Sequence, residues 1–145
     1  MTELKQAAKI AFATEFAFYL KAANFHWNVE GINFSQLHSL FERIYTEVYG
    51  SIDTFAEKIR SLGSYTPASL GRFAELSLVH DQREIVESAD MINILLADNE
   101  KVLEVLKLAY DIAEQQGENG FSNFLAERLD AHKKHGWMLR ATSKQ

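Results

Sequence analysis

The chain has 145 residues, no cysteine and a formal net charge of −5. This length fits one domain over residues 1–145, and the negative charge argues against a cationic nucleic-acid binder. Without cysteine, disulfides, thiolate ligands and a cysteine nucleophile are excluded. The single proline and seven glycines favour an all-α protein with few helix breaks.

The N-terminal segment indicates a cytoplasmic protein. Met1–Lys9 is polar and lacks the apolar core of a signal peptide. The apolar run Phe16–Ala23 is too short to span a bilayer, and Glu15 and Lys21 flank or interrupt it. We therefore expect no membrane partner.

Apolar spacing predicts the first two helices. The first spans about residues 3–28, with Thr2 at the capping position and apolar side chains in an i, i+3, i+4 pattern. After a short connection, the second spans residues 34–62, and Gly63 and Pro67 stop it.

A connection of roughly twenty residues follows, which is long for neighbouring helices. It contains one short helix within residues 68–78, and two further long helices span about residues 81–116 and 121–142. Two helices, a long crossover and two more helices form a ferritin-like four-helix bundle. Each of the last two helices is expected to have an apolar face directed toward the core. On the first of them this face consists of Ile85, Ala89, Ile92, Leu95, Leu96, Val102, Leu103, Leu106, Ala109, Tyr110 and Ala113, and on the second of Phe124, Leu125, Leu129, Trp137, Met138 and Leu139.

The second helix carries two different faces. At about 100° per residue, one side forms a core-facing stripe. Its members are Leu37, Phe41, Ile44, Val48, Phe55, Ile59 and Leu62. His38, Glu42, Asp53 and Glu57 share a separate arc beside this stripe, which is more potential metal ligands in register than a solvated surface needs.

These ligands form two pairs that one metal centre cannot join within a single helix. His38 and Glu42 are one turn apart, as are Asp53 and Glu57, but the pairs are roughly 22 Å apart along the axis. Two antiparallel copies related by a two-fold axis near Glu47 would bring one pair opposite the other and form two equivalent sites. The neighbouring stripe suits the seam of that dimer: Tyr45, Tyr49, Ile52 and Ala56.

A metal site inside one subunit finds little support in the sequence. Di-iron bundles commonly use Glu-x-x-His pairs, and the chain contains none. His26, at the end of the first helix, is expected to lie near His38. Imidazole and carboxylate ligands fit iron, zinc or manganese better than calcium, and several carboxylates without thiolates disfavour a closed structural zinc site.

The motif HWNV at residues 26–29 is followed by Gly31, Phe34, His38 and Glu42, and then by Asp53 and the tripeptide AEK at 56–58. This pattern resembles the ferroxidase motif of the Dps family of miniferritins (DNA protection during starvation). The segment HGWMLR at residues 135–140 is similar to that family's closing helix. The resemblance covers nearly the whole chain. Glu42 stands where many members carry aspartate, and the added methylene is expected to shift metal spacing or affinity without abolishing the site.

The resemblance implies a hollow dodecamer that oxidises ferrous iron, preferably with hydrogen peroxide, and stores a ferric mineral. Dioxygen is the other oxidant we expect. The resemblance also implies that His26, His38 and Glu42 of one subunit bind iron together with Asp53 and Glu57 of the partner. We expect zinc to be able to compete for the same ligands. Trp27 is a candidate electron relay beside the site, or else a packing residue.

Several plainer interpretations remain open. The carboxylates can be surface groups in helix ion pairs, such as Glu57 with Arg60. The run HKKH at residues 132–135 can be a second metal or anion patch, although a charged run is usually a solvated face. The family's acidic iron-entry pores suggest a role for Glu118, Glu127 and Asp130, for which a solvated face fits equally well.

The alternative functions are a non-enzymatic, DNA-compacting or structural cage with a vestigial or zinc-occupied site, and a monomeric helical binding module. We expect weak or no DNA binding, because the segment before the first helix holds no cluster of lysines and only Lys144 follows Arg140. Phosphate binding needs clustered positive charge.

Overall fold

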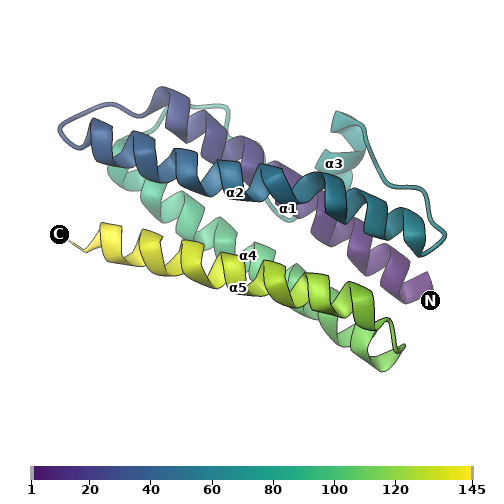
Figure 1. Ribbon diagram of the computed structural model, residues 1–145. Coiled ribbons are helices and arrows are strands. Elements are labelled where there is room, and N and C mark those ends of the chain that lie inside the picture. The colour runs from purple at the N-terminus through teal and green to yellow at the C-terminus, as the bar shows by residue number, and fades with distance from the viewer. Residues whose placement is uncertain (1, 145) are drawn as a thin grey trace.

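The computed structural model describes residues 2–144 and contains two pairs of long antiparallel helices (Figure 1). The first pair is α1 (Thr2–Asn28) and α2 (Phe34–Ser61), and the second is α4 (Ser88–Gln115) and α5 (Asn119–Ser143). The short helix α3 (Leu70–Leu76) lies in the connection between the pairs. This arrangement confirms the all-α, ferritin-like bundle with an extra helix in its crossover.

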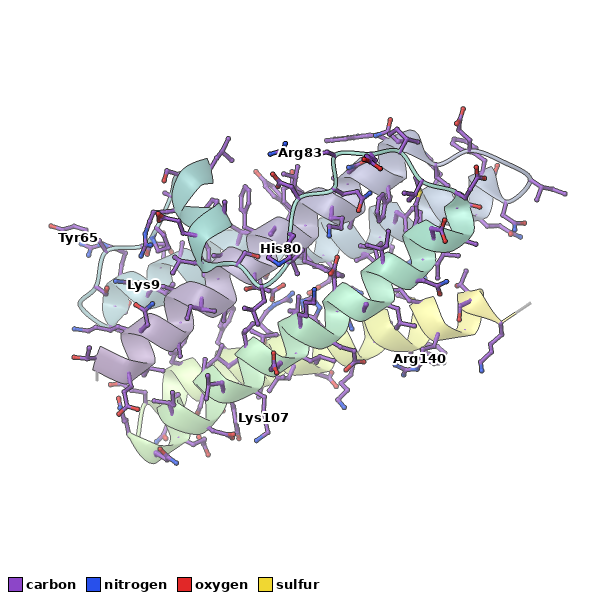
Figure 2. The ribbon with its side chains drawn as sticks, turned by 180° about the vertical axis from the view of Figure 1, so that it is seen from behind. Lys9, Tyr65, His80, Arg83, Lys107 and Arg140 are labelled. Atoms are coloured by element: carbon purple, nitrogen blue, oxygen red, sulfur yellow. The ribbon has the colours of Figure 1, made fainter. Side chains whose placement is uncertain are left out.

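The crossover lets α4 run in the same direction as α2 (Figure 1). It is held against α1 by side chains of that helix. The Thr14 hydroxyl accepts a hydrogen bond from the Leu78 backbone N–H at 3.2 Å, and the Asn24 amide donates to the Gln82 carbonyl at 3.1 Å. His80 and Arg83 extend from this segment on the face shown in Figure 2.

The core lies between the two helix pairs and follows the predicted stripes. Leu37, Phe41, Ile44, Val48, Phe55 and Ile59 of α2 are all buried, and Leu62 is half-buried. Phenylalanines from three helices meet in this core. Phe55 of α2 lies edge-on to Phe12 of α1 at 5.5 Å and to Phe124 of α5 at 5.2 Å between ring centroids.

The predicted start of the fourth helix in the structure, α4, was wrong by seven residues. Residues 81–87 form part of the crossover, and Glu87 has extended backbone angles just before α4. Because the Gln82 carbonyl accepts from Asn24, this segment is fixed along α1 rather than coiled into α4. Ile85, expected on the inward face, is exposed in the crossover, and Ala89 is exposed in the first turn of α4.

Two expectations on α5 were also wrong. Trp137, expected inward, is 59% exposed, because His135, Met138 and Leu139 occupy the inward side of the same turn. The run at residues 132–135 is not a uniformly solvated face. Lys133 and Lys134 are exposed, but His132 and His135 are buried.

No helix among residues 2–144 combines the length and the apolar character needed to cross a membrane.

Candidate metal centre

The tight connection between α1 and α2 brings two histidines together. Gly31 has a φ of +115°, which side chains with a Cβ rarely adopt, and its carbonyl accepts from the Phe34 N–H at 3.1 Å. The chain therefore reverses within a few residues. As a result, His26 in the last turn of α1 lies beside His38 in the second turn of α2.

His26 and His38 are locked by reciprocal hydrogen bonds. The Nδ1–H of His26 donates to the His38 carbonyl, and the Nδ1–H of His38 donates to the His26 carbonyl, each at 2.7 Å. The rings stack with centroids 3.8 Å apart. Because a carbonyl can only accept, each Nδ1 carries a hydrogen, so in the neutral imidazole each Nε2 keeps its lone pair. Both imidazoles are thus in the tautomer that binds a metal through Nε2.

Aromatic side chains surround the histidine pair on two sides. Phe34 stacks on His38 at 4.9 Å, and Tyr45 lies 5.2 Å from His26, both measured between ring centroids. His26 is buried and His38 is half-buried. This packing restricts both rings, so the orientation of the lone pairs is fixed before any ion arrives.

The three predicted carboxylate ligands are exposed on α2. Glu42 is one turn beyond His38, whereas Asp53 and Glu57 lie near the other end of the helix. None of the three forms an ion pair within residues 2–144. The plainer interpretation of Glu57 paired with Arg60 is therefore not observed, since Arg60 donates to the Ser64 carbonyl and lies over Tyr65.

The described residues of one chain do not form a complete metal site. Within residues 2–144, no group of three or more His, Asp or Glu side chains converges closely enough to hold an ion. The structure brings together only the two histidines and, one turn away, Glu42. Trp27 is 62% exposed and lies at the edge of a cavity of about 710 Å³ between α1, α3 and the crossover.

A largely buried polar cluster, which the sequence analysis did not predict, lies in the middle of the bundle, with Glu47 at its half-buried edge. Arg128 of α5 donates through Nε to Glu15 of α1 at 2.9 Å, and through Nη1 and Nη2 to Glu47 of α2 at 2.5 and 3.2 Å. His132 Nε2 lies 2.6 Å from Glu15, and His135 Nε2 lies 2.8 Å from Glu47. We call these five residues the interior cluster.

The spacing on α5 contains a signal for this cluster. Arg128, His132 and His135 alternate by four and three residues between the buried Leu125 and Leu139, which is the spacing of a core-facing helical stripe. Polar residues at core positions require partners. The charge of residues 132–135 favours a solvated face, but the spacing of the two histidines from Arg128 indicates that they face the core.

The interior cluster strongly perturbs the acid–base properties of its members. Burial alone would raise the pKa of Glu15, but His132 and Arg128 lower it below its usual value. Burial likewise opposes ionisation of Glu47, yet hydrogen bonds from His135 and Arg128 lower its pKa to about 2. Burial lowers the pKa of His135 despite the nearby Glu47 carboxylate. Both carboxylates are therefore ionised, and His135 is neutral, near neutral pH.

The fold is that of a ferritin-like protein, and comparisons with known proteins agree. A ferritin-like domain model matches residues 6–145. A DNA protection during starvation protein from Brevibacillus brevis is 36% identical over 123 residues, covering 85% of this chain and 83% of that protein. The chain belongs to the ferritin-like family and, within it, to the Dps family.

Solved structures give the same result. A Dps protein from Bacillus brevis superposes with a TM-score of 0.92 at 32% identity, covering 97% of this chain and 95% of that one. The Dps protein of Vibrio cholerae O1 superposes with a TM-score of 0.93 at 25% identity, covering 99% of this chain and 90% of that one. It is described as a member of a broad superfamily of ferritin-like diiron-carboxylate proteins.

Proposed function

We propose that this chain is a subunit of an iron-storing cage, a dodecamer, that oxidises ferrous iron at sites shared between subunits. In each site, His26, His38 and Glu42 of one subunit bind iron together with Asp53 and Glu57 of a two-fold partner. The observation that carries this proposal is the reciprocal locking of His26 and His38, which leaves both Nε2 lone pairs available near Glu42.

The kind and placement of the ligands support iron as the substrate. Imidazole nitrogen and carboxylate oxygen suit both ferrous and ferric ions. The Vibrio cholerae relative is described as ferritin-like and diiron-carboxylate. The two halves of the ligand set lie far apart on α2, so a second subunit is needed to complete each site.

The surface around the site supports an interface between copies of the chain. Tyr49 is 58% exposed, while Tyr45 and Ile52 are half-buried beside it. Tyr19 of α1 joins this surface at 5.0 Å from Tyr49, between ring centroids. Exposed aromatic side chains next to one another are typical of protein interfaces. The same surface lies between the two halves of the ligand set along α2.

Two ferrous ions held together can give two electrons to one molecule of hydrogen peroxide. The O–O bond breaks, two protons are taken up, two water molecules form and each iron becomes ferric. One-electron reduction, by contrast, would release hydroxyl radical. The protein's part is to hold both ions with fixed imidazoles and carboxylates. When only one iron is bound, we propose that Trp27 supplies the second electron.

Ferrous iron titration with peroxide under stopped-flow absorbance tests this function. His38→Ala and Asp53→Ala are each expected to remove the rapid ferric phase, because each change removes ligands from every shared site. The expected loss is about 100-fold or more in rate, because mutating even the outer-shell partners of metal ligands costs about 10–100-fold.

Matched control variants remove the same kinds of side chain elsewhere. His80→Ala in the crossover and Glu104→Ala on α4 remove exposed residues outside the proposed site. Both are expected to keep the wild-type rate. A rapid phase unchanged in His38→Ala and Asp53→Ala would refute the assignment.

A further inference from the structure

Three of the five tyrosines of the chain gather beside the histidine pair. Tyr45 lies 5.2 Å from His26, and Tyr19 lies 6.0 Å from Tyr45, both measured between ring centroids. Tyr49 lies 5.0 Å from Tyr19 by the same measure. We call Tyr19, Tyr45 and Tyr49 the tyrosine cluster. Its rings form a series that leads from a proposed iron ligand to a close pair of phenols.

The tyrosine cluster joins two helices. Tyr19 belongs to α1, whereas Tyr45 and Tyr49 lie one turn apart on α2. On the far side of Tyr19, Phe16 lies at 5.5 Å and stacks on Phe73 of α3 at 4.6 Å between ring centroids. Phenylalanine lacks the hydroxyl that makes tyrosine readily oxidised. An oxidising equivalent that reaches Tyr45 is therefore expected to stay on the tyrosines.

This inference rests on the proposed function, which supplies ferrous iron and hydrogen peroxide beside His26. With a single ferrous ion, each peroxide needs a second electron, and Trp27 can give one only once. In a further turnover, a tyrosine of the cluster can give that electron and lose its phenolic proton. The ferrous ion becomes ferric, the O–O bond breaks, and the peroxide leaves as one water and one hydroxide. One tyrosyl radical remains.

We propose that the tyrosine cluster takes oxidising equivalents from the shared iron site and converts them into a covalent bond between Tyr19 and Tyr49. Tyr45 is the relay: after losing an electron and a proton to the site, it recovers both from Tyr19.

Two such turnovers, each with one ferrous ion and one peroxide, leave two tyrosyl radicals in the pair. The rings of Tyr19 and Tyr49 are inclined by 40° and need only a small movement to meet. A carbon–carbon bond forms between the ring positions next to the hydroxyls, and the two displaced ring hydrogens return to the phenol oxygens. The product is a dityrosine that ties α1 to α2 beside the iron site.

Dityrosine fluorescence and peptide mapping by mass spectrometry test this bond. The full chain receives two successive additions of one ferrous ion per site, with peroxide in excess. The peptides of Tyr19 and Tyr49 are expected to become joined within one chain, with the loss of two hydrogen atoms. Tyr19→Phe and Tyr49→Phe are each expected to abolish this product. Tyr65→Phe, after α2, and Tyr110→Phe, on α4, are matched changes outside the cluster and should keep it.

A metal-free reaction separates the tyrosine pair from its supply of oxidising equivalents. Photochemical one-electron oxidation with a ruthenium tris-bipyridyl complex and persulfate reaches tyrosines without iron. Tyr45→Phe is expected to keep the bond between Tyr19 and Tyr49 in this reaction. With iron and peroxide the same variant should lose most of the product per ferric ion formed, because only that route passes through Tyr45.

Ferric absorbance is recorded in every sample with iron, so that a failure of the proposed function is seen separately. Rapid ferric formation without dityrosine, or a dityrosine that joins two chains, would overturn the proposal. So would a Tyr45→Phe variant with an undiminished yield in the iron reaction, or with no product in either reaction. Absence of the rapid ferric phase from the unaltered chain would refute the proposed function, and this inference with it.

Discussion

At the scale of single residues, the reciprocal bonds between His26 and His38 make each histidine the support of the other. Each Nδ1–H donates to the partner's backbone carbonyl, so both rings hold their orientation through the same short connection. Replacing one ring removes a proposed ligand and the ring that stacks on the other histidine, whose hydrogen bond to the backbone carbonyl remains. Because both rings are proposed ligands of the same site, we expect the two side chains to act as a unit.

A double-mutant cycle on this pair checks that statement. His26→Ala and His38→Ala are each expected to slow rapid ferrous oxidation about 100-fold. The double variant is expected to be little slower than either single one, because groups that act as a unit are not additive. Stopped-flow rates of the four proteins give the coupling. Two losses that multiply would show that the rings act independently.

The interior cluster is expected to make the fold sensitive to acid. Because His135 has a lowered pKa, its contribution to stability falls as pH drops below its ordinary value of about 6.5. Glu47 has a pKa of about 2 instead of 4.5, so its contribution is present above pH 4.5 and is lost as pH falls toward 2. Both shifts have the same sign, and the unfolding temperature should fall from neutral pH downward.

Thermal melts between about pH 7 and pH 3 measure this effect. Glu47→Gln should lower stability at neutral pH and flatten the part of the curve below pH 4.5, because its titrating group is gone. Glu104→Gln, an exposed carboxylate on α4, should leave the curve unchanged. If the melting temperature of Glu47→Gln falls below pH 4.5 as steeply as that of the wild type, the role assigned to the Glu47 carboxylate is contradicted.

At the scale of helices, the periodicity of apolar residues and the positions of helix-breaking glycine and proline predicted most of the architecture. The bounds of α1, α2 and α5 differ by only one or two residues from those expected, and α3 falls within its predicted window. The start of α4 was missed because Ile85 and Val86 continue an apolar pattern in a segment that long-range hydrogen bonds hold along α1. Contacts between residues far apart in the chain cannot be detected from a short stretch of sequence.

The same limit applies to the candidate metal centre. Helix geometry alone predicted that His26 would lie near His38, and their rings are stacked at 3.8 Å. The role of Arg128 could not be predicted in this way, because its partners Glu15 and Glu47 are more than eighty residues away. Close packing of α4 and α5 is also hidden in the sequence: a Cβ on Gly136 would lie only 3.0 Å from the Asn99 amide nitrogen.

Phe55 is the residue with which to test how the helices hold together. It is fully buried, and its ring meets phenylalanines of α1 and α5. Phe55→Ala is expected to cost about 3–5 kcal/mol, from lost burial and the cavity left behind. Urea unfolding at one fixed protein concentration measures the change in free energy.

Leu108→Ala is the matched control for Phe55→Ala. Leu108 lies on α4 and is 55% exposed. Its replacement is expected to change the free energy of unfolding by no more than about 0.5 kcal/mol. Equal effects of the two substitutions would show that the aromatic cluster is not a main source of stability.

At the scale of the whole molecule, the four cations labelled in Figure 2 do not gather in one place. The labelled cations Lys9, Arg83, Lys107 and Arg140 come from separate elements and lie apart. Together with the net charge of −5, this agrees with the expectation of weak or no DNA binding, which stays a prediction.

The central claim concerns two chains: neither holds a complete iron site, and each supplies what the other lacks. Subunit complementation measures this directly. His38→Ala and Asp53→Ala are purified, unfolded together and reassembled in equal amounts, alongside each variant treated alone. In a mixed two-fold pair, one site loses both residues and the other keeps both.

Random pairing then restores about one quarter of the wild-type sites, since half of the pairs are mixed and each regains one of its two sites. We predict that the reassembled mixture regains about a quarter of the rapid ferrous oxidation, while each variant alone stays inactive. A mixture as inactive as its components, although wild-type protein recovers activity from the same treatment, would contradict sites shared between subunits.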